Sequence, residues 1–233
     1  FIGKAIEKKR EDWIIATKFG HKYHTYSHKT THFSPQDVVQ QLENSLKALQ
    51  TDYIDIYQFH SGSNDEFDQK ELWNALDKQV QAGKIRHMGI SIVNSAVLSD
   101  DIYQVESASS VNAEVIQVVY NRLNKKAEER VFPSCSRQKL GVIGRIPLAK
   151  GYLSGKYHPG FIFPENDIRF TYDKEETLKQ LQRIHEIKHN EVPDDVNMAQ
   201  WALAWCLMHP AVTTVIPGCK SVEQVESNAK SAD

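Results

Sequence analysis

Short apolar runs alternate with amphipathic helical patterns along nearly the whole chain. Six runs rich in β-branched and aromatic residues predict strands at residues 13–18, 53–60, 87–92, 115–121, 141–148 and 213–217. Helical patterns, with apolar residues three and four positions apart, follow several of these runs. This alternation is typical of βαβ units in a parallel sheet. We therefore expect an α/β fold.

Three of the helical patterns are clear. In "SPQDVVQQLENSLKALQ" Ser34 suits an N-cap and Pro35 suits the first helical position. The apolar stripe of this helix consists of Val38, Leu42, Leu46 and Leu49. "LWNALDKQVQAGK" predicts a second helix, which ends at Gly83. "VNMAQWALAWCLMHP" is apolar on nearly all sides, which predicts a buried helix that ends before Pro210.

The order of elements also indicates the domain organisation. The longest irregular segment, about Gly151 to Thr171, has the length of a functional loop. No repeat or linker composition is visible, so we expect one domain over residues 1–233. An eight-stranded (β/α)₈ TIM barrel has about 30 residues per unit. We expect six of its eight units here, because the chain opens inside the helical pattern "FIGKAIEKKR" and ends inside "SVEQVESNAKSAD". The barrel would then be incomplete at both ends.

The composition of the chain limits the classes of function that the protein can have. Apolar residues make up 40% of the chain and the net charge is −2, which disfavours nucleic acid and anionic membranes as partners. The sequence shows neither a signal peptide nor an apolar run of about 18 residues, so we expect a cytoplasmic protein. The three cysteines, Cys135, Cys206 and Cys219, lack the spacing of a disulfide framework or a zinc site. The oligomeric state is not legible in the sequence.

Two residues are candidates for chemistry. Lys18 ends the apolar run "IIATK" and His60 ends "YIDIYQFH". In an α/β barrel the active site lies where strands end, so both side chains are expected in one cavity. Taken singly, each position favours a structural interpretation: Lys18 as a surface lysine just past a strand end and His60 as a hydrogen-bonded core histidine.

The sequence resembles the aldo-keto reductase family, with the bacterial branch as the nearest match. The motifs, in the family's order, are "IIATKFG", "SLKALQTDYIDIYQFH", "AGKIRHMGIS", "IQVVYN", "PLAKGYLSGKY", "FPENDIRF", "AQWALAWCLMHPAVTTVIPG" and "SVEQVESN". The resemblance covers essentially all 233 residues. It implies a (β/α)₈ barrel that binds NADP(H), a small-molecule carbonyl substrate, and an Asp, Tyr, Lys, His tetrad in which Lys18 and His60 are the last two members.

The resemblance also implies a mechanism. The family's Asp and Tyr belong to a "DTAxxYGxSE" stretch that precedes the helix with which this chain begins. An alkoxide-like oxygen forms when a carbonyl accepts hydride, and it must be protonated. Lys18 would lower the pKa of the tyrosine acid through its positive charge. His60 would donate a hydrogen bond to the carbonyl oxygen of the substrate.

The same resemblance assigns the cofactor contacts. Ser91 and Gln117 would hold the nicotinamide carboxamide, and Arg145 could stack on its ring. Leu148, Gly151 and Lys156 would bind the pyrophosphate, while Arg169 could close over the cofactor. The loop of Gly218 and Lys220 precedes a helix N-terminus, which suits an adenosine 2′-phosphate and favours NADP(H). The residues expected to reach the adenine and ribose are Gln224 and Asn228, which lie one turn apart.

One other function remains open, a non-catalytic NADP(H)-binding subunit with a regulatory or redox-sensing role, such as the β subunits of voltage-gated potassium channels. A third function, a metal-assisted lyase on the same barrel, is disfavoured. The histidine-rich loop "GHKYHTYSHKTTHF" has few carboxylates, so we expect no metal site there and interpret the loop as part of the substrate wall.

Overall fold

The computed structural model describes residues 1–25 and 28–232. The chain divides into two compact units. Unit 1 comprises Phe1–Val118 and Lys126–Ile143, and unit 2 comprises Val119–Lys125 and Gly144–Asp233. The neighbouring strands of the main sheet are, in order, β1 (Ala16–Phe19), β4 (Ile54–His60), β5 (Ile85–Ser91), β6 (Ala113–Val119), β7 (Gly141–Arg145) and β8 (Thr214–Ile216). The chain passes between the units within β6 and within β7.

Parallel strands form the centre of unit 1. They are β1 (Ala16–Phe19), β4 (Ile54–His60), β5 (Ile85–Ser91) and β6 (Ala113–Val119). Each of the pairs β1·β4, β4·β5 and β5·β6 is parallel. The first four predicted strands are therefore confirmed, with ends that differ by at most three residues, and so is the α/β class. The closed barrel stays a prediction.

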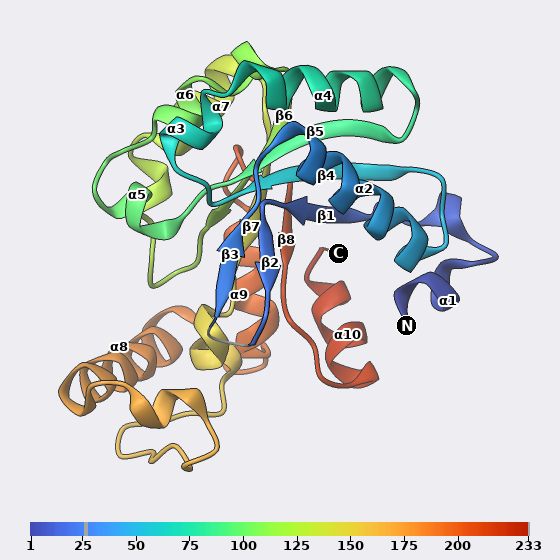
Figure 1. Ribbon diagram of the computed structural model, residues 1–233. Coiled ribbons are helices and arrows are strands. Elements are labelled where there is room, and N and C mark those ends of the chain that lie inside the picture. Colours follow the sequence, from blue (N-terminus) through green and yellow to red (C-terminus); the bar gives the residue numbers. More distant parts are fainter. Residues whose placement is uncertain (26–27, 233) are drawn as a thin grey trace. The chain divides into compact units, whose positions relative to one another are not determined.

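Helices α2 (Pro35–Leu49) and α4 (Lys70–Gln81) cover one face of this sheet (Figure 1). Ser34 caps α2 as expected, because its side chain accepts a hydrogen bond from the Asp37 amide. The apolar stripe is buried at Val38, Leu42 and Leu46. Helix α2 contacts β1 and α4, and α4 contacts β5. The two helices predicted from periodicity thus form the outer layer of unit 1.

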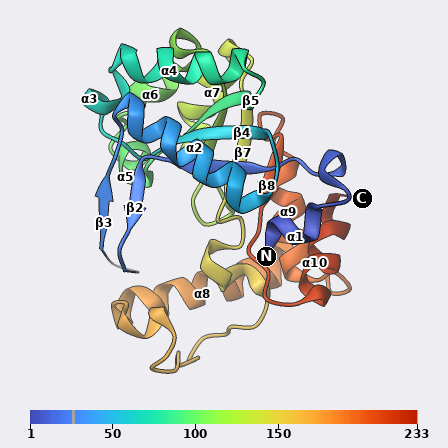
Figure 2. The ribbon, with the colours of Figure 1, turned by 45° about the vertical axis from the view of Figure 1, so that its right-hand side comes forward.

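The sequence predicted only a loop where the structure has a β-hairpin. Strands β2 (His21–Tyr23) and β3 (Lys29–Thr31) pair in antiparallel register. Figure 2 shows them as an arm that leaves the end of β1. The remaining elements of unit 1 are α1 (Ile2–Ile6), α3 (Asn64–Phe67), α5 (Asn94–Leu98), α6 (Tyr103–Glu106), α7 (Val131–Gln138) and the 3₁₀ turns Arg10–Asp12, Ala108–Val111 and Lys126–Glu128.

Unit 2 contains the end of β7 (Gly141–Arg145), β8 (Thr214–Ile216), and the helices α8 (Lys174–Glu191), α9 (Met198–Leu207) and α10 (Val222–Ala229). The last two predicted strands and the apolar helix, α9, are confirmed, but β7 ends at Arg145, three residues before the predicted end. Helix α8 was not predicted. The expected irregular segment contains only the 3₁₀ turns Ala149–Ser154 and Ile168–Thr171. The last residues described form the turn Lys230–Ala232. None of the helices in the described part of the chain is both long and apolar enough to cross a membrane.

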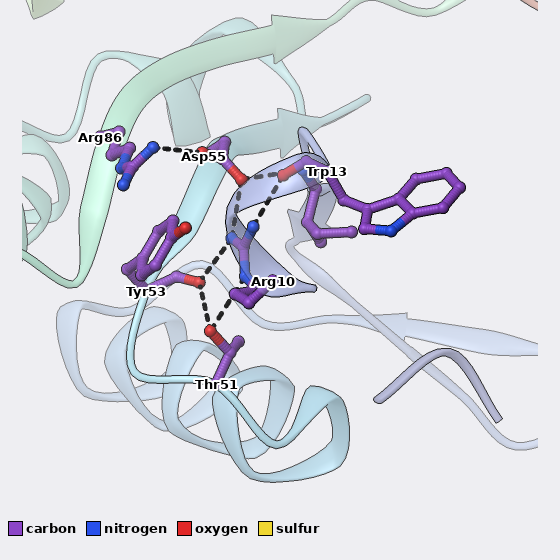
Figure 3. A network of polar contacts seen from close by, with 7 residues as sticks. Arg10, Trp13, Thr51, Tyr53, Asp55 and Arg86 are labelled. Carbon is purple, nitrogen blue, oxygen red and sulfur yellow. Dashed lines mark hydrogen bonds and ion pairs between the residues drawn. The ribbon is translucent and has the colours of Figure 1, made fainter. Parts of the chain in front are cut away.

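A buried carboxylate, Asp55, fixes the start of β1 against β4 (Figure 3). Its Oδ2 accepts hydrogen bonds from the Ile15 amide at 2.9 Å and from Arg10 at 2.7 Å, and its Oδ1 accepts one from Arg86 at 3.0 Å. The Tyr53 ring lies within 3.9 Å of both guanidinium carbons. Burial alone would raise the pKa of Asp55, but the Ile15 amide and the two arginines outweigh burial and lower it.

We expect the substitution Asp55→Asn to lower the free energy of unfolding by about 3 kcal/mol at pH 6, because two cations lose their charged partner. The folded state favours the carboxylate, so its contribution is present above the ordinary pKa of 3.8 and is lost as the pH falls below that value. Urea unfolding should therefore show the difference between wild type and variant shrinking from pH 6 to pH 3. The exposed neighbour Asp52→Asn serves as control. A difference that does not change with pH would contradict this account.

Candidate functional site

The two catalytic candidates share one face of the unit 1 sheet. The Tyr57 hydroxyl donates to the Val38 carbonyl of α2, so Tyr57 faces the helical layer. Phe19 packs on Tyr57 with ring centroids 4.8 Å apart and faces the same way. Because side chains alternate along a strand, Lys18 and His60 point to the opposite face. Both are half-buried.

The strand register places further predicted site residues beside Lys18 and His60. Lys18 pairs with Gln58, His60 with Ser91, and Ser91 with Gln117. The Ser91 hydroxyl lies 3.3 Å from Gln117 Oε1, and both residues are buried. The strand ends thus place four of the predicted site residues, Lys18, His60, Ser91 and Gln117, on neighbouring strands of unit 1.

Sequence reasoning missed Gln58. Its side chain is fully buried, and neither amide atom has a hydrogen-bond partner among the described residues. A Cβ at Gly89 would lie 3.0 Å from Gln58 Cγ, so the glycine of β5 makes room for this side chain. The available signal was its position, two residues before His60 and therefore on the same face.

His21 is a second residue that the sequence did not single out. Its ring packs against the His60 ring with centroids 5.0 Å apart. Its Nε2 lies 3.1 Å from the Lys29 ammonium, across the hairpin. Burial and the nearby Lys29 charge lower the pKa of His21, so the imidazole is neutral at neutral pH. The hairpin therefore contacts the strand ends through His21, which packs on His60, the histidine predicted to act on the substrate.

In unit 2, a cleft of about 650 Å³ lies between the 3₁₀ turns, β8 and α10. Eight of the eleven predicted cofactor residues line it: Leu148, Gly151, Lys156, Arg169, Gly218, Lys220, Gln224 and Asn228. Its charged lining consists of Lys150, Lys156, Arg169 and Lys220 against Glu223, four cations and one carboxylate. This excess of positive charge favours an anionic ligand.

Arg169 is held in place from several sides. Its guanidinium donates to Asp167 at 2.6 and 2.8 Å, to the Lys150 carbonyl at 3.2 Å and to the Tyr157 hydroxyl at 2.8 Å. It also lies 4.2 Å from the Phe163 ring centroid. The Arg169 bonds hold the pKa of Asp167 at about 2. Arg169 is thus a fixed wall of the cleft, and its expected closure over a cofactor stays a prediction.

Two of the predicted residues form hydrogen bonds to the loop before α10. Gln224 Oε1 accepts a hydrogen bond from the Lys220 amide at 2.8 Å, and Asn228 Nδ2 lies 3.2 Å from Cys219 Sγ. Ser221 caps the helix by accepting from the Gln224 amide. Gln224 and Asn228 therefore share one face of α10, as their spacing predicted, and both hold the loop as well as line the cleft.

The backbone from Ile146 to Gly151 is strained. Ile146, Ala149 and Lys150 have φ values of 57°, 47° and 57°, which non-glycine residues rarely adopt. Gly151 has φ 89°, and its amide donates to the Leu148 carbonyl at 2.8 Å. Strain of this kind is concentrated at functional sites. Arg145, just before this segment, is half-buried, and burial lowers its pKa, but it is not part of the cleft lining.

Over the described part of the chain, no group of three His, Cys, Asp or Glu side chains is placed to hold a metal ion. Two histidines of this segment contact a threonine: His24 and His32 each place Nε2 within 3.0 Å of Thr30 Oγ1.

The model of the aldo/keto reductase family matches residues 1–233. The chain belongs to this family. It is 29% identical over 227 residues to "Aldo-keto reductase yakc [NADP(+)]" of Schizosaccharomyces pombe, covering 94% of this chain and 65% of that protein. It therefore spans about two thirds of the length of this relative.

Two other relatives bear on function. The holo structure of the aldo-keto reductase AKR11C1 from Bacillus halodurans is 30% identical with a TM-score of 0.76, covering 100% of this chain and 71% of that one. A probable voltage-gated potassium channel subunit beta of Arabidopsis thaliana is 26% identical over 243 residues, covering 100% of this chain and 73% of that protein.

Gly151 and Gly160 provide a matched pair for testing the packing of the cleft wall. Their φ values are +89° and +84°, so alanine strains the backbone at both, by about 1 kcal/mol. A Cβ at Gly151 would lie 3.3 Å from Arg169 Nη1, whereas one at Gly160 meets nothing within 4 Å. We expect Gly151→Ala to lower the free energy of unfolding more than Gly160→Ala in urea titrations. Equal losses would show that Arg169 moves freely.

Proposed function

We propose that the protein containing this chain is an NADP(H)-dependent reductase of aldehydes or ketones. The observation that carries the proposal is the placement of Lys18 and His60 on one face, at neighbouring strand ends of unit 1. A lysine so placed can supply the positive charge, and a histidine the hydrogen-bond donor, that carbonyl reduction needs. The family membership supports the same class of reaction.

Each residue has a distinct role in this proposal. The nicotinamide supplies the hydride when the cofactor is bound. His60 donates a hydrogen bond to the carbonyl oxygen, which polarises the carbonyl and fixes its orientation. Lys18 keeps a positive charge near the tyrosine acid that the family places ahead of this chain's first helix. That charge lowers the tyrosine pKa from about 10, so the phenol can protonate the developing alkoxide.

The chain's own residues suit the cofactor. Ser91 and Gln117 offer a buried hydroxyl and amide for the carboxamide, and Arg145 offers a planar cation for the ring. The cationic cleft of unit 2 suits the phosphates, through Lys156 and the backbone of residues 148–151. Lys220, the loop at Gly218 and the N-terminus of α10 suit a 2′-phosphate. Gln224 and Asn228 would reach the adenine and ribose, and Arg169 would close over the cofactor. The Schizosaccharomyces pombe relative is named for NADP(+), which supports this choice.

A non-catalytic NADP(H)-binding subunit is the second candidate, because the chain is also similar to the Arabidopsis thaliana channel subunit. Both functions require the unit 2 cleft. Only the reductase requires that Lys18 and His60 accelerate turnover, so steady-state rates separate the two.

We expect Lys18→Met to lower kcat for NADPH-dependent reduction of a reactive aldehyde by about 10²–10⁴-fold, the usual contribution of a positioned acid. Cofactor affinity should hardly change, because Lys18 acts on the acid and not on the dinucleotide. Steady-state rates and a fluorescence titration with NADPH measure both quantities. The control is Lys47→Met, an exposed lysine of α2. Equal rates for Lys18→Met and wild type would refute the role of Lys18.

The preference for NADPH should depend mainly on Lys220. A charge-assisted contact to the 2′-phosphate contributes about 1.5–3 kcal/mol, which corresponds to roughly ten- to a hundredfold in affinity. Lys220→Ala should weaken NADPH binding by that factor and leave NADH binding nearly unchanged. Because Lys220 is exposed, added salt should reduce the wild-type preference.

The control for Lys220 is Lys230→Ala, which removes an exposed lysine of unit 2 outside the cleft lining. Fluorescence titrations of both cofactors at two ionic strengths provide the measurement. The assignment of Lys220 fails if wild type binds NADH as tightly as NADPH, or if both lysine variants behave alike.

A further inference from the structure

The β2–β3 hairpin carries an excess of positive charge. Residues 20–34 contain two lysines and four histidines and no aspartate or glutamate. Within the described parts of the chain, the ion pair recorded for this segment joins His32 to Asp37 at 3.7 Å, and none joins Lys22 or Lys29 to a carboxylate. The charges of the two lysines are therefore not neutralised by the hairpin itself.

The hairpin register separates the two lysines. Tyr23 pairs with Lys29, and Lys22 pairs with Thr30. Directly paired residues share a face and successive residues alternate, so Lys29 and Lys22 lie on opposite faces. His21 is two residues before Tyr23 and lies on the Lys29 face, which is the face that meets His60.

His21 connects the Lys29 ammonium with His60. Its Nε2, 3.1 Å from Lys29 Nζ, accepts a hydrogen bond, because an ammonium can only donate. The proton of the neutral ring is then on Nδ1, which is buried against His60. The negative charge of Glu66 in α3 opposes this and raises the pKa of His21, but less than burial and Lys29 lower it. Glu66 Oε2 already accepts hydrogen bonds from the Ser63 amide and hydroxyl. The His21 imidazole contacts both the Lys29 ammonium and the His60 ring. It carries no negative charge, so it does not neutralise the ammonium.

We propose that Lys29, oriented by His21, forms a subsite for an anionic group on the carbonyl substrate. The ligand class is a short aldehyde or ketone that carries a carboxylate or a phosphate, with its carbonyl at His60 and its anion at Lys29. This inference deepens the proposed function and depends on it, because it takes His60 as the residue that orients the carbonyl. Lys29 is then a residue that determines specificity, and His21 is a positioning residue.

Matched substrate pairs test the subsite. Butanal and succinic semialdehyde differ by a carboxylate, and glyceraldehyde and glyceraldehyde 3-phosphate differ by a phosphate. For the anionic member of the preferred pair, Lys29→Met should lower kcat/KM by roughly tenfold through KM, because one charge-assisted contact is lost. The neutral members should change less than twofold. The pair with the larger effect identifies the anion.

Lys22→Met is the control, because it removes the same charge from the other face of the hairpin. The subsite is refuted if Lys22→Met has as large an effect as Lys29→Met, which would indicate general attraction by the hairpin charge. It is equally refuted if Lys29→Met leaves both anionic substrates unaffected.

A binding measurement separates this inference from the proposed function. Inorganic phosphate and acetate are titrated in turn into the protein while the His21 imidazole signals are followed by NMR. One of the anions should shift these signals in wild type and not in Lys29→Met, whether or not any substrate turns over. If wild type fails to reduce butanal but shows this shift, the reductase function is wrong and the anion site stands. The absence of a shift with both anions refutes the subsite.

Discussion

The hydrogen bonds of Asp55 set the register on which the unit 1 site depends. Asp55 binds the Ile15 amide at the start of β1 while its own backbone belongs to β4. A shift by one residue would turn Lys18 to the helical face, because side chains alternate along a strand. With the observed register, Lys18, His60 and Ser91 face the same side on successive strands. A contact at the beginning of the strands thus fixes which side chains share a face at their ends.

In unit 2, repulsion among the cations of the cleft has to be overcome for the cleft to keep its shape without a ligand. Arg169 is held by Asp167 and by the aromatic residues Tyr157 and Phe163, whose rings lie 4.6 and 4.2 Å from the guanidinium carbon. The left-handed residue Lys150 accepts a hydrogen bond from Arg169 through its carbonyl oxygen. Part of the free energy of folding is therefore used to keep the cleft cationic and preformed, which lowers the ordering cost of binding an anion.

The sequence predicted the strands and helices that depend on apolar patterning. It did not predict the features of the structure that polar contacts determine. Buried parallel strands are rich in apolar residues, so β1, β4 and β5 were visible, and the ends of the runs at β1 and β4 indicated Lys18 and His60. The hairpin was missed because its strands are short and polar, with no apolar alternation to reveal them. Gln58 and His21 were missed because their importance comes from neighbours distant in sequence, Gly89 and His60. Strand ends were uncertain because β1 begins where Asp55 binds Ile15, which no local pattern shows.

A crystal structure of the protein with NADP⁺ tests the account most directly. The account predicts the 2′-phosphate within hydrogen-bond distance of Lys220 Nζ and the first turn of α10, and the carboxamide bonded to Ser91 and Gln117. A dinucleotide that lies outside the unit 2 cleft, or whose nicotinamide makes no contact with Ser91 or Gln117, would contradict it.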